Sequence, residues 1–145
     1  MSTKHVLLSA TALGVLAQSG HAGTDTWSLL KQIDISETVT ETTYEVKKTF
    51  PTELRDGAIE VEITGYAVPR IPGDTVQDII LVSDMGLCPF CGSLDHGGNL
   101  QVLLENDIPS FEDGQRMTLR GTLEPVTDPE TWQAAILKNA RIIPR

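Results

Sequence analysis

The sequence predicts a mainly β protein whose core is a small, closed, five-stranded barrel of the OB type. Three observations indicate this class. Apolar and polar residues alternate with a period of two in several segments. Turn-forming Gly, Pro and Asp residues separate those segments. Two of the longest alternating segments also contain an internal glycine, at which a strand can bend. A two-sheet β-sandwich is the alternative fold.

The first 22 residues have the pattern of a secretory signal peptide. A basic start at Lys4 and His5 precedes the apolar run from Val6 to Leu16, and Gly20 and Ala22 supply the small residues of a cleavage site. The apolar run is too short for a membrane span. A buried N-terminal helix is the alternative interpretation. We expect cleavage after Ala22 and, from the charge pattern, localisation in a bacterial periplasm.

The remaining residues, 23–145, are enough for one domain with its own hydrophobic core. The whole chain has a net charge of −9, and removing Lys4 with the signal peptide makes it −10. An acidic surface of this kind repels nucleic acid and anionic lipid, and is compatible with cations or basic partners. Solubility accounts for most of the charge.

The segment before the barrel is predicted to hold one short helix and one short strand. Residues Thr26–Ile33 place their apolar side chains on one helical face. Asp34–Thr43 is polar and threonine-rich, so we expect a linker or irregular arm there. Tyr44–Lys48 is predicted to be a short strand. The predicted organisation is therefore a signal peptide at 1–22, a helix and arm at 23–49, and the barrel domain at 50–145.

The clearest strand begins after Ala58, where Ile59, Val61 and Ile63 alternate with Glu60 and Glu62. Four more strands are predicted at Val76–Val82, Leu100–Leu104, Met117–Leu123 and Ala134–Ile143. The alternation predicts that the barrel interior includes Val61, Ile63, Leu81, Met117, Leu119 and Ile142.

Gly65 and Gly121 favour the barrel over the sandwich. Each interrupts a long strand pattern, and a glycine there lets one strand bend and serve both halves of a barrel. OB barrels often bind nucleic acid, but the acidic charge and the lack of a row of aromatic residues on the strands exclude that class. Trp27 and Trp132 are predicted to be core or anchor residues.

The most informative motif is Cys-Pro-Phe-Cys-Gly, which starts at Cys88 and contains the only two cysteines of the chain. Thiolates at this spacing can share one soft metal ion, such as Zn²⁺ or Cu⁺. His96 can turn back as a third ligand, and Asp95, Asp84 or a partner could supply the fourth. Three good ligands suit an open site or a transfer site better than a closed structural one.

Two other interpretations of Cys88 and Cys91 stay open. The motif is similar to the active pair of glutaredoxins, but the residues after Cys91 do not form the helix that lowers a thiol pKa in that fold. An exported protein can also hold a local disulfide that stiffens one turn.

Enzymatic function is not indicated by any motif. The sequence contains no serine in a nucleophile elbow and no glycine-rich phosphate loop. His96 is the only histidine outside the predicted signal peptide, so no pair of histidines can act together. We therefore expect a protein that is not an enzyme.

The order of these motifs resembles a family of exported bacterial domains of unknown function. The resemblance covers residues 50–143 and rests on Phe50, Leu54, Asp56-Gly57, Val61–Pro69 with its Gly-Tyr-Ala-Val-Pro end, Ile79–Val82, the cysteine loop and Leu119–Leu123. It implies an OB-like fold, a periplasmic setting and a role in metal handling, and it supplies no catalytic residues. Members are often lipoproteins encoded near export-type ABC transporters, which implies a periplasmic or transporter-associated partner. This chain has no lipid-anchor cysteine, and it has a complete Cys-x-x-Cys where many members differ.

The sequence thus predicts a periplasmic accessory protein that binds or delivers a transition metal through Cys88, Cys91, His96 and Asp95. A thiol-redox or disulfide-stabilised interaction module is the second hypothesis.

Overall fold

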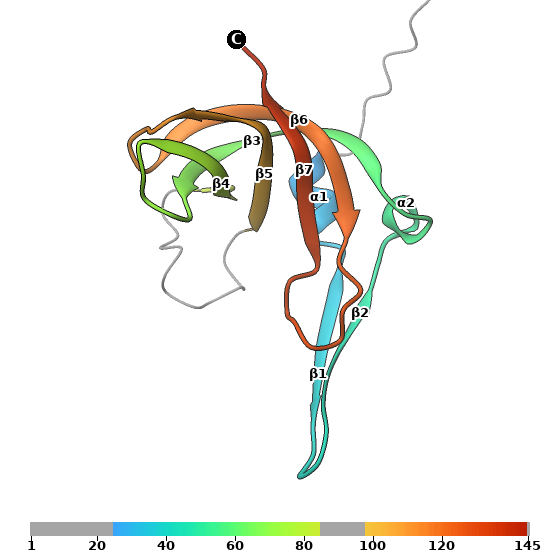
Figure 1. Cartoon of the computed structure of the whole chain (residues 1–145). Helices are drawn as coiled ribbons and strands as arrows, with labels where there is room; N and C mark the ends of the chain where they lie inside the picture. Colours follow the sequence, from blue (N-terminus) through green and yellow to red (C-terminus); the bar gives the residue numbers. More distant parts are fainter. Residues whose placement is uncertain (1–24, 85–97, 145) are drawn as a thin grey trace, which may run out of the picture.

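The computed structural model of the chain describes residues 25–84 and 98–144 (Figure 1). The predicted signal peptide lies outside the described residues. The elements are, in chain order, α1 (Thr26–Leu30), β1 (Asp34–Val39), β2 (Tyr44–Thr49), α2 (Thr52–Arg55), β3 (Ile59–Pro69), β4 (Thr75–Val82), β5 (Asn99–Pro109), β6 (Gln115–Pro125) and β7 (Ala135–Ile142).

Five strands close into a barrel in the order β3-β4-β5-β7-β6, and β6 pairs with β3 to complete it. Four of the strand pairs are antiparallel, and the β5–β7 pair is parallel. This is the strand order of the OB fold, in which the third strand of the barrel lies between the second and the fifth. The predicted barrel is therefore confirmed over the sandwich, and every strand predicted after Ala58 is present.

Gly65 and Gly121 lie where two backbones approach closely. A Cβ atom on Gly65 would lie 2.6 Å from the carbonyl oxygen of Val82, and one on Gly121 would lie 2.7 Å from the carbonyl oxygen of Lys138. Side chains at these positions would push β4 away from β3, or β7 away from β6. The glycines thus permit the tight strand contacts that a small closed barrel needs.

The barrel interior contains most of the residues that the alternation predicts. Ile63, Leu81, Met117 and Leu119 are buried. Val61 is half-buried and packs against the edge of the core. The prediction for Ile142 was wrong, because this side chain is 43% exposed. The pairing of β6 with β7 shifts between Arg120 and Thr122 and Ala140 is buried, whereas Ile142 is the last residue of β7 and is exposed at the end of the strand.

The helix α1 is shorter than predicted and ends at Leu30. The side chain of Asp25 caps its first turn by accepting a hydrogen bond from the backbone N–H of Ser28 at 3.2 Å. The short helix α2 was not predicted, because four residues give no helical periodicity, but it buries Leu54 completely.

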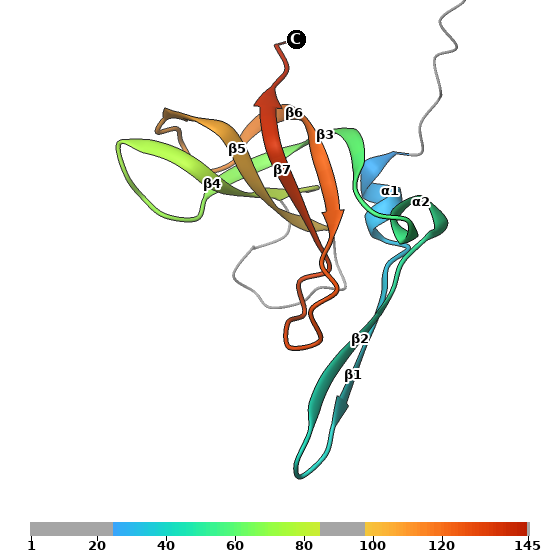
Figure 2. The same cartoon turned by 45° about the vertical axis from the view of Figure 1, so that its right-hand side comes forward.

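The expectation of an irregular arm at Asp34–Thr43 was wrong. Residues Asp34–Val39 form β1, which pairs along its whole length with β2 in an antiparallel hairpin. Figures 1 and 2 both show this hairpin projecting away from the barrel. Nearly all of its side chains are exposed, so neither face shows the alternation that marks a half-buried strand.

No helix within residues 25–84 and 98–144 is long and apolar enough to cross a membrane.

Candidate functional site

The predicted metal ligands Cys88, Cys91, Asp95 and His96 lie outside the described residues. Asp84 is among the described residues and is exposed. It follows Ser83, which pairs with Gly98 at the end of the β4–β5 ladder. In the two described ranges, no group of three His, Cys, Asp or Glu side chains is placed to hold a metal ion. The structure therefore does not test the predicted metal site.

Both ends of the cysteine-containing segment are attached to the barrel. The backbone N–H of Ser83 donates a hydrogen bond to the carbonyl oxygen of Gly98 at 3.1 Å. The N–H of Gly98 in turn donates to the hydroxyl oxygen of Ser83 at 3.1 Å. These two bonds extend the β4–β5 ladder by one step and fix the points at which the chain leaves and rejoins the barrel.

Trp27 packs against the second of these attachment points. A Cβ atom on Gly98 would lie 2.6 Å from Cε3 of Trp27, so only a glycine allows the indole to lie this close. The indole Nε1–H donates to the carbonyl oxygen of Thr64 at 2.7 Å, which attaches α1 to β3. The prediction that Trp27 is a core or anchor residue is confirmed, because only 8% of it is exposed.

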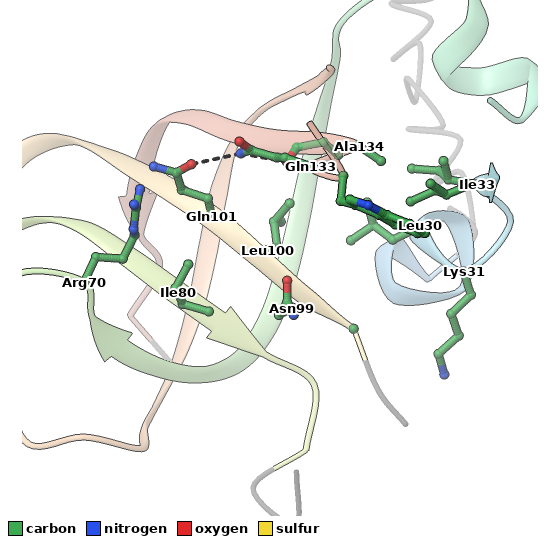
Figure 3. A pocket seen from close by; sticks show the side chains of 14 residues that line it. Leu30, Lys31, Ile33, Arg70, Ile80, Asn99, Leu100, Gln101, Gln133 and Ala134 are labelled. Carbon is green, nitrogen blue, oxygen red and sulfur yellow. Dashed lines mark hydrogen bonds between the residues drawn. The ribbon is translucent and has the colours of Figure 1, made fainter. Parts of the chain in front are cut away.

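A groove of about 680 Å³ opens on the outer face of β4 and β5 (Figure 3). It lies between this face, the α1–β1 segment, and the connections that follow β3 and β6. Fourteen of the described residues line it: Leu30, Lys31, Ile33, Ile35, Arg70, Ile80, Gly98, Asn99, Leu100, Gln101, Trp132, Gln133, Ala134 and Ala135. Its volume is within the range of about 300–1,000 Å³ that is usual for small-molecule sites.

A row of hydrogen-bonded polar side chains follows one side of the groove. The guanidinium of Arg70 donates to the Asp78 carboxylate at 3.1 Å. The amide of Gln101 donates to both oxygens of the same carboxylate at 3.1 Å. Gln133 then donates to the side-chain oxygen of Gln101 at 2.8 Å, the bond drawn in Figure 3. Each of these groups is oriented by its neighbour in the row.

Aliphatic side chains form another part of the lining, although Leu100 is only 2% exposed and faces the barrel core. Ile80 and Leu100 come from the adjacent strands β4 and β5, and Leu30 and Ile33 come from the α1–β1 segment. Trp132 also lines the groove and is 39% exposed, so of the two predicted roles, core or anchor residue, the core role does not apply to it. An apolar lining with a few fixed polar groups is the usual composition of a ligand site.

Lys48 attaches the β1–β2 hairpin to the connection that carries Trp132 and Gln133. Its ammonium donates to the carbonyl oxygens of Val126, Asp128 and Gln133 at 3.0, 2.8 and 2.7 Å. Burial lowers the pKa of Lys48 below its ordinary value, and the nearby charge of Asp128 partly offsets this. The hairpin is further attached by the N–H of Val46, which donates to the carbonyl oxygen of Pro129 at 2.8 Å.

Sequence reasoning missed the groove because its lining comes from four distant parts of the chain. No contiguous motif joins Leu30, Arg70, Gln101 and Gln133. A signal did exist at the level of the fold, since OB barrels bind ligands on the face of their second and third strands, beside the two flanking connections. In this chain those strands are β4 and β5.

In comparisons with protein-family models, with curated proteins and with solved structures, nothing matches this chain. The resemblance to exported bacterial domains therefore stays a prediction.

Proposed function

We propose that this chain is an exported accessory protein, not an enzyme, that binds a soft transition metal ion through Cys88 and Cys91. The observation that carries the proposal is the spacing of these two cysteines, followed within five residues by Asp95 and His96. Two thiolates and one imidazole are a ligand set that Zn²⁺ and Cu⁺ prefer. With three good ligands, the site keeps one position for Asp95 or for a partner's ligand, as transfer requires.

The scaffold around the segment supports this proposal. The Ser83–Gly98 bonds and the packing of Trp27 on Gly98 fix both ends of the segment on the barrel. The described core comes from the barrel strands, from α2 and from α1. Uptake and release of a metal should therefore leave the barrel folded, which suits a protein that delivers its ion.

The charge of the chain supports a cationic cargo. The net charge of −9 attracts metal cations and basic protein surfaces. We propose a periplasmic location and a periplasmic or transporter-associated partner, in line with the signal-peptide pattern. The second candidate, a thiol-redox or disulfide-stabilised module, uses the same two cysteines.

Metal titration of the reduced protein tests the proposal. We expect the wild type to bind about one Zn²⁺ or Cu⁺ per chain, the ratio that a single site allows. Affinity should weaken as the pH falls, because thiolates must be deprotonated to bind. Cys91→Ser should abolish binding, and His96→Ala should weaken it more than the neighbouring control Asp95→Ala.

Two results would contradict a metal site. Native protein could contain a Cys88–Cys91 disulfide that resists mild reductant, which would favour the structural alternative. Reduced wild type could also bind metal no better than Cys91→Ser. Rapid exchange with a dithiol at a moderate potential would instead favour the redox alternative.

A further inference from the structure

The groove on β4 and β5 differs in charge from the rest of the chain. The chain has 20 acidic residues, whereas the described residues that line the groove include two cations, Lys31 and Arg70, and the one carboxylate beside them, that of Asp78, is held by Arg70 and Gln101. Figure 3 shows Arg70 and Lys31 on opposite sides of the groove, with Ile80 and Leu100 between them. The lining thus combines apolar side chains with a guanidinium, that of Arg70, at one end.

Arg70 is placed to bind an anion. Its side chain is 46% exposed, and Asp78 orients the guanidinium through a single contact at 3.1 Å. Asp78 is also occupied by two hydrogen bonds from Gln101. The other N–H donors of the guanidinium have no acceptor among the described residues. A planar guanidinium with free donors binds a carboxylate through two parallel hydrogen bonds.

We propose that this groove binds an anionic amphiphile, a small molecule with an elongated apolar body and one carboxylate. The carboxylate pairs with Arg70, and the apolar body lies on Ile80 and extends toward Leu30 and Ile33. The row formed by Gln101 and Gln133 borders this path, and the side-chain oxygen of Gln133 offers an acceptor to a polar substituent.

The charge of the whole chain restricts the ligand to a compact monoanion. A polyanion such as nucleic acid, or the surface of an anionic bilayer, extends beyond the groove and meets the acidic surface of the protein. A small ligand whose single carboxylate is bound at Arg70 stays within the groove and does not contact the acidic surface. Its apolar body gains affinity with each methylene that it buries in the groove.

The two proposals rest on different residues, Arg70 and Ile80 for the groove, and Cys88 and Cys91 for the metal. Loss of metal binding in Cys91→Ser leaves the groove proposal standing, and loss of ligand binding in a groove variant leaves the metal proposal standing.

Calorimetric titration of the full chain with three ten-carbon probes tests the proposal. We expect decanoate to bind with a 1:1 ratio, decanol to bind more weakly, and decyltrimethylammonium to bind weakest. In Arg70→Gln, decanoate affinity should fall roughly tenfold or more, because one charge-assisted interaction is lost, and decanol affinity should not change. The matched control is Arg116→Gln, which removes the same charge from an exposed position on β6 outside the groove.

A second variant tests the location of the apolar body. Ala134→Trp adds a large side chain to the lining and should abolish binding of both decanoate and decanol, while thermal unfolding shows that the variant is folded. The proposal is overturned if decanoate does not bind, if Arg70→Gln and Arg116→Gln weaken it equally, or if folded Ala134→Trp binds it like the wild type. Equal affinity for decanol and decanoate would also remove the role of Arg70.

Discussion

At the scale of single residues, Lys48 makes a connection that its position in the sequence does not suggest. It lies on an exposed hairpin, but its ammonium satisfies three carbonyl oxygens of the β6–β7 connection, about 80 residues later in the chain. Its neighbour Lys47 is exposed and contributes no such contacts among the described residues. Two adjacent lysines therefore have different structural roles.

Replacing Lys48 with Met should destabilise the protein by about 1–3 kcal/mol, because the carbonyl groups lose a donor that water replaces only in part. Urea unfolding followed by circular dichroism measures the change. Lys47→Met is the matched control and should lie within about 0.5 kcal/mol of the wild type. Equal effects of the two substitutions would show that Lys48 does not hold the hairpin in solution.

Some functional residues can be predicted from the sequence and others cannot, depending on whether their contacts are local in the chain. Cys88 and Cys91 can be recognised because their chemistry depends on spacing along the chain. Arg70, Gln101 and Gln133 belong together only after the barrel has closed, since their contacts join three separate parts of the sequence. The contact between Lys48 and Gln133 cannot be predicted from the sequence for the same reason.

At the scale of elements, burial decides which strands the sequence predicts. Strands of the barrel have one face in the core, so Ile63 and Leu119 leave a period-two signal in the sequence. The hairpin strand Asp34–Val39 has no buried face, and the polar, threonine-rich segment Asp34–Thr43 was therefore interpreted as an irregular arm. Edge position and exposure, not weak β propensity, explain this error.

The two barrel glycines allow a quantitative prediction for the elements. A methyl group at Gly121 would meet the Lys138 carbonyl oxygen at 2.7 Å and Cα of Ala140 at 3.0 Å, so Gly121→Ala must displace β7. We expect a loss of about 1–3 kcal/mol in the free energy of unfolding, the usual cost of overpacking. Gly65→Ala should cost a similar amount, because Val82 and Leu81 lie equally close.

Gly73→Ala is the control for these substitutions. Gly73 lies in the β3–β4 connection, and its closest contact would be the Thr75 carbonyl oxygen at 3.3 Å. Denaturant unfolding of the three variants should show that Gly73→Ala is clearly more stable than Gly65→Ala and Gly121→Ala. If Gly121→Ala were as stable as Gly73→Ala, the close approach of β6 and β7 would not be a requirement of the fold.

At the scale of the whole molecule, one pair of barrel strands carries the groove and both attachment points of the cysteine-containing segment. The cysteine segment begins and ends where β4 and β5 meet, and the groove lies along their outer face. Both sites depend on the barrel remaining closed, and closure depends on a core in which Leu119, Leu123 and Leu137 are fully buried. The stability of this core can therefore be tested independently of either function.

Leu119→Asp should unfold the domain. Leu119 has no exposed surface, and an unpaired charge in this position costs several kcal/mol, which is a large part of the roughly 5–15 kcal/mol that stabilises a domain. Val61→Asp should cost less, because Val61 is half-buried at the edge of the core. Glu62→Ala removes only an exposed ion pair with Arg120 at 2.9 Å and should cost no more than about 1 kcal/mol. Circular dichroism and gel filtration should therefore rank the three variants in this order. Similar losses of stability in all three variants would mean that the side chains of β3 and β6 that point into the core are not the ones described. The assignment of an outer face to β4, on which the groove depends, would then be wrong as well.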